Sequence, residues 1–323
     1  MTPYTLTVGC FGKLPLAADF MSQHSGLTEG VALERWLQEG VNLTHVRYGD
    51  RAEGLLRAMP RVWFHFWRNS PEHGLTGVMG PSRDQSGRVF PFAVYAHARS
   101  TGAGYPAPLA ALLDPFLRRA SSVTCAEWKD LPSLSAAISS LAQPSPLDPP
   151  PISSEVVLES VSLGAFAASL SGSGAVNPAI RVATNLLEVA HRTSVPVYGL
   201  RFRLPEGVEV WGPALVFWLE LCRAIFRNAG RPPFLLWNEP SAGRVEVIDV
   251  YYQPPGPLAF LHLLDPTLDS ESLYPVEAEE ARTLAVPLAA LAPLESWKQT
   301  SLSLRQALQV FARPKSQDGK GDS

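Results

Sequence analysis

The order of apolar and polar residues in the first part of the chain predicts an alternation of strands and helices. Residues 4–11 alternate apolar side chains with threonines, which is the period of a half-buried strand. From about Val31, apolar residues recur every three or four positions and predict an amphipathic helix that packs through one face. Residues 62–67 are aromatic or β-branched apart from His65, which predicts a buried strand.

Two further strands are predicted at residues 74–79 and 88–97, with a turn at residues 82–87 between them. This turn is rich in Asp, Ser and Gly, which are typical turn residues because Asp and Ser accept hydrogen bonds from nearby backbone N–H groups. Gly87 is expected to take a positive φ, since glycine lacks the Cβ that makes this conformation unfavourable.

Helical patterns over residues 108–121 and 125–142 end at a proline-rich segment, residues 143–153. Its five prolines favour an extended backbone over a helix interior or a central strand. We interpret it as a linker, with a long connection inside one domain as the alternative. The predicted organisation is a first domain over 1–142, a linker over 143–153, a second domain over 154–312 and a disordered tail over 313–323.

The second domain again mixes helices and strands. Helical patterns cover residues 178–192, 211–228, 257–264 and 301–311, and strand patterns cover residues 195–204, 234–237 and 245–251. Each half thus contains a helix, a pair of strands and a following helix, which suggests an architectural duplication. The patterns predict an α/β protein of the α+β type.

Charge and composition narrow the classes of partner. The net charge of −3, from 27 basic and 30 acidic residues, gives no general attraction to nucleic acid, and the arginines are scattered along the chain. No nucleic-acid partner is therefore expected. Because only 18% of the residues are charged, the chain is expected to bury large surfaces or to present some to another protein.

Several sequence features favour the cytoplasm. The N-terminus has neither the basic region nor the apolar run of a signal peptide. The most apolar stretch, residues 213–225, is shorter than a membrane span and carries two charges, so no membrane insertion is expected. Cys10, Cys125 and Cys222 are widely separated, and we interpret them as buried thiols in a reducing compartment.

A search for catalytic and cofactor-binding motifs finds few candidates. The chain has no Walker-type phosphate loop and no nucleophile elbow, and its seven histidines lack metal-ligand spacing. No cofactor, metal or catalytic residue is predicted. Ser82 follows a predicted strand, however, so a hydrolase that uses it together with a histidine brought close by the fold stays an alternative.

Charged residues mark two loops that leave predicted strands. Lys13 and Asp19 lie on a bend made by glycines and a proline, and Asp84 and Arg88 flank the predicted turn. We expect the four charges to cluster, with Arg88 pairing with Asp84 or Asp19 in a bidentate contact. Such a cluster is either an internal brace or a surface for a partner, and the residues themselves favour the brace.

The same loops carry a family resemblance over about the first hundred residues. The motif residues, in chain order, are Phe11-Gly12-Lys13-Leu14-Pro15, Asp19-Phe20, Trp36-Leu37-Gln38, Gly49, Pro60-Arg61-Val62-Trp63-Phe64, Gly77-Val78, Pro81-Ser82, Asp84, Gly87-Arg88 and Phe90-Pro91. Their order and spacing resemble the TagF family of type VI secretion accessory proteins. Ala18 stands where that family usually has glycine, and Gln85 where it often has a basic residue.

The resemblance implies an antiparallel sheet flanked by helices and a role in the bacterial cytoplasm. The family regulates type VI secretion after translation, usually as a repressor, and the implied partner is a forkhead-associated scaffold protein. It assigns no catalytic residue. The candidate partner-binding or structural residues are therefore Lys13, Asp19, Ser82, Asp84, Arg88 and Pro91. A structural subunit of the secretion baseplate is a further alternative.

Overall fold

The computed structural model describes most of the chain. The described residues are 4–24, 27–67, 73–100, 114–143, 154–171, 176–204, 208–226, 233–239, 246–268, 271–278 and 287–311. The predicted tail, nearly all of the predicted linker and residues 240–245, which connect two predicted strands, lie outside them.

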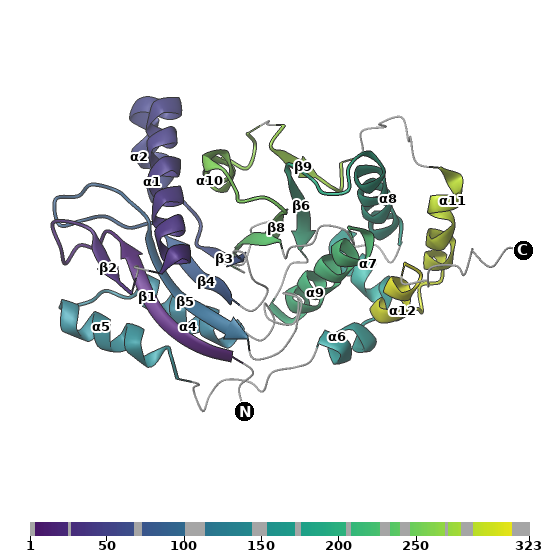
Figure 1. The fold of residues 1–323 in the computed structure, drawn as a ribbon, viewed down its shortest axis with the longest axis horizontal. Helices are drawn as coiled ribbons and strands as arrows, with labels where there is room; N and C mark the ends of the chain where they lie inside the picture. The colour runs from purple at the N-terminus through teal and green to yellow at the C-terminus, as the bar shows by residue number, and fades with distance from the viewer. Residues whose placement is uncertain are drawn as a thin grey trace, which may run out of the picture.

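A single nine-stranded sheet, in the order β2-β1-β5-β4-β3-β7-β8-β6-β9, runs through both halves of the chain (Figure 1). Every neighbouring pair is antiparallel except β6 and β9. The predicted fold class is thereby confirmed. The strands are β1 (Tyr4–Gly12), β2 (Met21–Gln23), β3 (Val62–Trp67), β4 (His73–Gly80), β5 (Phe92–Ser100), β6 (Gly199–Leu204), β7 (Phe234–Asn238), β8 (Glu246–Tyr251) and β9 (Leu273–Pro275).

Helices cover both faces of the sheet, and the 3-10 helices η1 (Gly49–Arg51) and η2 (Ala292–Lys298) extend two of them. The α-helices are α1 (Thr28–Tyr48), α2 (Ala52–Arg57), α4 (Asp114–Cys125), α5 (Leu131–Ser140), α6 (Ser154–Ser160), α7 (Leu163–Ser171), α8 (Asn177–Arg192), α9 (Val208–Ile225), α10 (Pro257–Leu264), α11 (Leu288–Leu291) and α12 (Leu304–Gln309). In the described part of the chain, no helix has the length and apolarity needed to span a membrane.

Strand β3 lies at the centre of the sheet, and its side chains divide between two hydrophobic cores. Trp63 belongs to the core that includes α4 and α9, whereas Phe64 belongs to the core that includes α1 and α10. Successive side chains of a strand point to opposite faces, so a central strand covered on both faces is apolar throughout. His65 is the exception, and burial lowers its pKa to about 3.

The two halves of the chain meet where β3 pairs with β7. Trp63 lies opposite Trp237 in the register, and the side chain of Glu239 contacts Arg61 and Ser121. The predicted division into two domains stays a prediction, because its boundary falls largely outside the described residues. The suggested duplication is not confirmed: the first half contributes only antiparallel neighbours, whereas the second ends in the parallel pair β6 and β9.

Several local predictions were wrong, among them the start of the strand predicted at residues 195–204, which begins at Gly199. Strand β5 begins at Phe92 and not at residue 88, because Arg88 closes the preceding loop through a hydrogen bond from Asp84 N to Arg88 O. Helix α5 begins at Leu131 and not at residue 125, since Asp130 caps it by accepting a hydrogen bond from Ser133 N at 2.7 Å. Cys125, expected to be buried, is exposed.

Candidate functional site

The two motif loops emerge at the same end of the sheet. Strands β1 and β4 both pair antiparallel with β5, so they run in the same direction on either side of it. Their last residues, Gly12 and Gly80, both lie opposite Phe92 in the register. The loop after β1 and the loop after β4 are therefore neighbours, although about seventy residues of chain separate them.

A buried ion pair joins these loops. Lys13 Nζ lies 3.0 Å from Asp84 Oδ2, and the two residues are only 7% and 2% exposed. The other carboxylate oxygen, Oδ1, accepts hydrogen bonds from Ser86 N, Ser86 Oγ and Arg88 N at 3.0, 2.7 and 2.9 Å. Arg88 Nε donates to Oδ2 at 2.6 Å. Five donors thus surround the carboxylate of Asp84.

These contacts keep Asp84 ionised. Burial raises the pKa of the Asp84 carboxyl, but the hydrogen bonds from Ser86, Lys13 and Arg88 outweigh it, so the pKa lies well below its ordinary range. An aspartate held in this way neither accepts a proton at neutral pH nor has a free oxygen for a ligand. The arrangement is that of an internal brace.

Backbone contacts strengthen the same junction. Arg88 Nη2 donates to the carbonyl oxygen of Ala18 at 2.7 Å, and Gln85 N donates to the carbonyl oxygen of Ala17 at 3.0 Å. The Arg88 side chain is nevertheless 61% exposed. Arg88 therefore ties the loops together with one part of its guanidinium and presents another part to solvent.

Asp19, the fourth charge of the expected cluster, lies at the rim. Its side chain is exposed and accepts a hydrogen bond from Phe20 N at 2.8 Å. No ion pair with Lys13 or Arg88 is found for it within the described part of the chain. The structure thus brings together Lys13, Asp84 and Arg88, and it leaves Asp19 beside the peptide that Arg88 contacts.

The aromatic residues of the two loops pack beside the brace. Phe20 is 39% exposed, stacks on Phe11 at a centroid distance of 5.3 Å and meets Phe90 edge-on at 4.8 Å. Lys13 Nζ lies 5.1 Å from the centroid of the Phe20 ring. This cation–π contact adds to the attraction that holds the lysine in a buried position.

Ser82 and Pro91 contribute mainly through their backbones. The carbonyl of Ser82 accepts a hydrogen bond from Phe90 N at 3.1 Å. Among the described hydrogen bonds, none joins Ser82 to a histidine. Pro91 is buried, and a Cβ on Gly12 would lie only 2.2 Å from its carbonyl oxygen. Since Gly12 also has a φ of +137°, only glycine fits this crossing of the loops.

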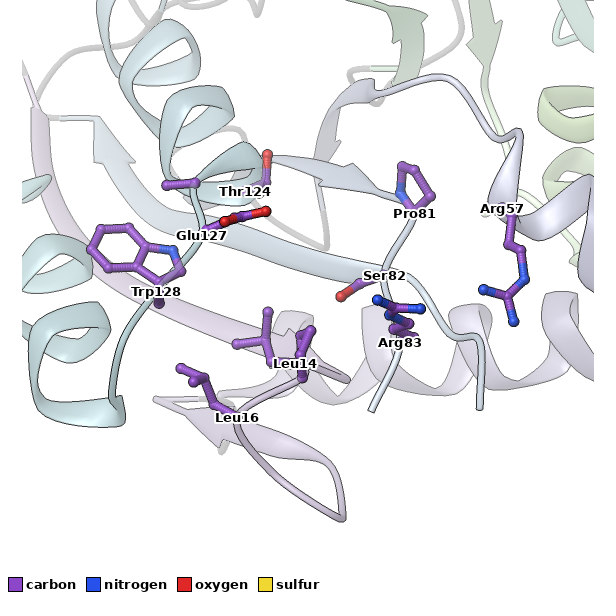
Figure 2. A pocket seen from close by; sticks show the side chains of 11 residues that line it. Leu14, Leu16, Arg57, Pro81, Ser82, Arg83, Thr124, Glu127 and Trp128 are labelled. Atoms are coloured by element: carbon purple, nitrogen blue, oxygen red, sulfur yellow. The ribbon is translucent and has the colours of Figure 1, made fainter. Parts of the chain in front are cut away.

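A pocket of about 550 Å³ opens next to the brace (Figure 2). It lies between the two motif loops, the end of α2 and the connection from α4 to α5. Its lining residues are Leu14, Pro15, Leu16, Arg57, Pro81, Ser82, Arg83, Thr124, Ala126, Glu127 and Trp128.

Sequence reasoning missed most of this pocket. Arg57, Arg83 and the residues from Thr124 to Trp128 belong to no recognised motif, and residues 125–142 were expected to form one helix. The sequence did contain one signal for the wall formed by the α4–α5 connection. This is Trp128, a large aromatic residue between Glu127 and Lys129. Within the described residues, no group of three or more His, Cys, Asp or Glu side chains is placed to hold a metal ion.

Comparison with known protein families now adds to this geometry. Residues 9–143 match the family model described as "TagF N-terminal domain, Type VI secretion system-associated". Residues 9–143 are thus similar to the TagF N-terminal domain. This confirms the family resemblance of the motif loops, and the brace and the whole lining of the pocket lie within the matched segment.

Two further comparisons concern the whole chain. A comparison with curated proteins found no match. Among solved structures, the chain is similar to "PA0076 from Pseudomonas aeruginosa PAO1", with 20% sequence identity and a TM-score of 0.48. That alignment covers 83% of this chain and 99% of the other.

Proposed function

We propose that this protein is a non-enzymatic regulator of a bacterial type VI secretion system, which acts in the cytoplasm after translation by binding another protein. The observation that carries the proposal is the TagF N-terminal domain over residues 9–143, a domain described as associated with this secretion system. All six candidate residues predicted from the sequence fall within it.

The proposed partner is a forkhead-associated scaffold protein, and the proposed effect is repression. Both come from the resemblance of the motif loops to TagF. A regulator of this kind needs an exposed surface on a rigid support, and the two braced loops provide one. Arg88, Asp19, Phe20 and Arg83 all have exposed side chains at this end of the sheet.

The geometry of the brace supports a binding role over a catalytic one. Asp84 is saturated by five donors and is ionised well below neutral pH, which makes it unsuitable as a general base. The hydrolase alternative requires a histidine beside Ser82, and none of the residues that line the pocket is a histidine. These observations favour protein binding as the activity of this site.

Binding and secretion measurements test the proposal together. The purified full chain is titrated against the purified forkhead-associated scaffold protein of the same secretion system, with and without threonine phosphorylation of the scaffold. Secretion is then compared between cells that overproduce the chain and cells that do not. We expect saturable binding and reduced secretion on overproduction.

Three results would contradict the proposal. Absence of scaffold binding together with unchanged secretion would remove the regulatory role. Stable, stoichiometric co-purification of the chain with the secretion apparatus would favour the baseplate-subunit alternative instead. Turnover of ester substrates that is lost in Ser82→Ala but retained in Ser86→Ala would favour the hydrolase.

A further inference from the structure

We propose that the pocket beside the Lys13–Asp84 brace binds a short acidic segment of a partner protein, in which a leucine-like side chain neighbours a carboxylate. This inference deepens the proposed function and rests on it, since it names the surface and the chemistry of the contact.

The shape and lining of the pocket suit an apolar side chain. Leu14 is buried and forms part of the floor, and Leu16 and Trp128 are half-buried beside it. Figure 2 shows these three side chains gathered on one side of the pocket. A volume of about 550 Å³ is within the range of small ligand sites and admits one or two side chains of a peptide.

The two arginines of the lining favour a bound carboxylate on the side of the pocket away from the apolar side chains. Arg83 is exposed, and within the described residues no acidic side chain pairs with it. Arg57 Nη2 contacts Glu53 and the carbonyl of Gly87 only at 3.4 Å, and its side chain is 48% exposed. Two guanidinium groups in this position bind carboxylates well, because arginine offers a planar fork of N–H donors.

The wall opposite Arg57 determines how a bound segment is oriented in the pocket. The carboxylate of Glu127 and the hydroxyl of Thr124 lie on the same side as Trp128, away from Arg57 in Figure 2. Both oxygens offer acceptors for the backbone N–H groups of a bound segment, and the carboxylate of Glu127 also repels its acidic side chain. The segment is therefore oriented with its carboxylate toward Arg83.

The brace holds the pocket ready for binding. Leu14 directly follows Lys13, and Arg83 directly precedes Asp84, so the ion pair fixes the apolar floor relative to the cationic wall. Walls that are already in place lose little conformational freedom when a ligand binds, which strengthens association. This gives the buried pair a function at the surface without any direct contact to the partner.

Three short peptides test this inference on the full chain. The probes are acetyl-Leu-Glu-Leu-amide and its Gln and Lys analogues, and the readout is the methyl NMR signals of Leu14 and Leu16. We expect the Glu peptide to shift both leucines and to bind about fivefold more tightly than the Gln peptide, the effect of one exposed ion pair. The Arg83→Glu variant should prefer the Lys peptide.

A matched control variant distinguishes an effect of the pocket from an effect of the net charge of the protein. Lys129→Glu changes the net charge by the same amount close to the pocket without altering its lining. It should leave the order of the three affinities unchanged, and matched thermal melts verify that both variants are folded. Absent shifts at Leu14 and Leu16, equal affinities for the three peptides, or equal effects of the two variants would overturn the inference.

The peptide titration contains no secretion component. Its outcome is therefore independent of the experiments that test the proposed function. If the scaffold binds the wild type and Arg83→Glu equally well and the peptides do not bind, the pocket is excluded as the contact surface. If the peptides bind as expected and the scaffold does not, the site stands and the regulatory partner is a different acidic protein.

Discussion

The ammonium group of Lys13 lies 3.0 Å from the carboxylate of Asp84, although 71 positions separate the two residues in the chain. Neither residue is exposed enough to take part directly in a protein contact. The pair therefore acts on function only through the loops that it joins, and its loss should be seen first in stability.

Removal of the Asp84 charge is expected to destabilise the protein strongly. Asp84→Asn leaves the Lys13 ammonium buried without its partner and turns an amide N–H₂ toward the donors of Ser86 and Arg88. A buried pair broken on one side is much less stable than the intact pair, so we expect Tm to fall by roughly 10 °C. Thermal unfolding followed by circular dichroism measures the change.

A double variant checks the reason for this loss. Lys13→Met combined with Asp84→Asn removes the buried ammonium as well, so its decrease in Tm should be clearly smaller than the sum of the two single decreases. Asp19→Asn serves as the surface control and should change the free energy of unfolding by less than about 0.5 kcal/mol. Strict additivity would show that the two charges are not coupled.

Two glycines with positive φ should respond differently to alanine. Gly12→Ala would place a Cβ 2.2 Å from the Pro91 carbonyl oxygen, so the loops must separate and the protein should lose most of its stability. Gly87 has a φ of +90° but no atom within 4 Å of an added Cβ. Gly87→Ala should therefore cost only about 1 kcal/mol, the strain of the backbone conformation itself.

Urea unfolding of both variants measures these losses. A Gly12→Ala protein as stable as Gly87→Ala would show that the loops do not cross as closely as described.

Burial of His65 predicts a loss of stability in mild acid. The pKa of His65 is about 3 in the folded protein, below the ordinary value of about 6.5, so the unfolded chain takes up a proton that the folded chain does not. Stability from this group is present above about pH 6.5 and decreases as the pH falls toward 3. The slope is about 1.4 kcal/mol per pH unit for the one proton.

The non-titrating variant His65→Gln isolates this contribution. Urea unfolding of the wild type and the variant between pH 7 and pH 4.5 should show a shallower pH dependence in the variant. The absolute stability of the variant is not the readout, because the substitution also alters packing in β3. Equal slopes would mean that His65 is protonated in the folded protein.

The junction between β3 and β7 is expected to couple the two halves of the chain. Trp237 is 1% exposed and its ring lies 6.2 Å from that of Trp63, so Trp237→Ala should cost about 3–5 kcal/mol. Hydrogen exchange should show that β1 and β5 lose protection together with β6 and β8. Loss of protection in the second half alone would support two independently stable domains.

Local patterns predicted the elements whose residue spacing or composition is distinctive along the chain. The spacing of apolar residues predicted α1 and α8, the aromatic run predicted β3, and the turn before β5 was found from its Asp and Gly. The start of α5 was missed because the Asp130 cap, a single side-chain contact, overrides a helical pattern that continues through it.

The candidate site was predicted in composition but not in arrangement. Lys13, Asp84 and Arg88 were expected to cluster and do meet, whereas Asp19 was expected among them and lies at the rim. The sequence did not distinguish the two aspartates, because both lie in loops that leave predicted strands. Their difference lies in the surrounding donors: Asp84 has five within its own loop and across to β1, and Asp19 has the N–H of Phe20.

By itself, the sequence determined β1, α1, β3 and β4 in the first hundred residues, the glycine at the turn and the motif that matches the TagF N-terminal domain. Those features depend on local periodicity and backbone preference. The tertiary structure decided that β1 and β4 end together beside β5, that the Lys13–Asp84 pair is buried, and that Trp128 and Arg83 face one pocket. These depend on strand order, which brings together residues that no local pattern connects.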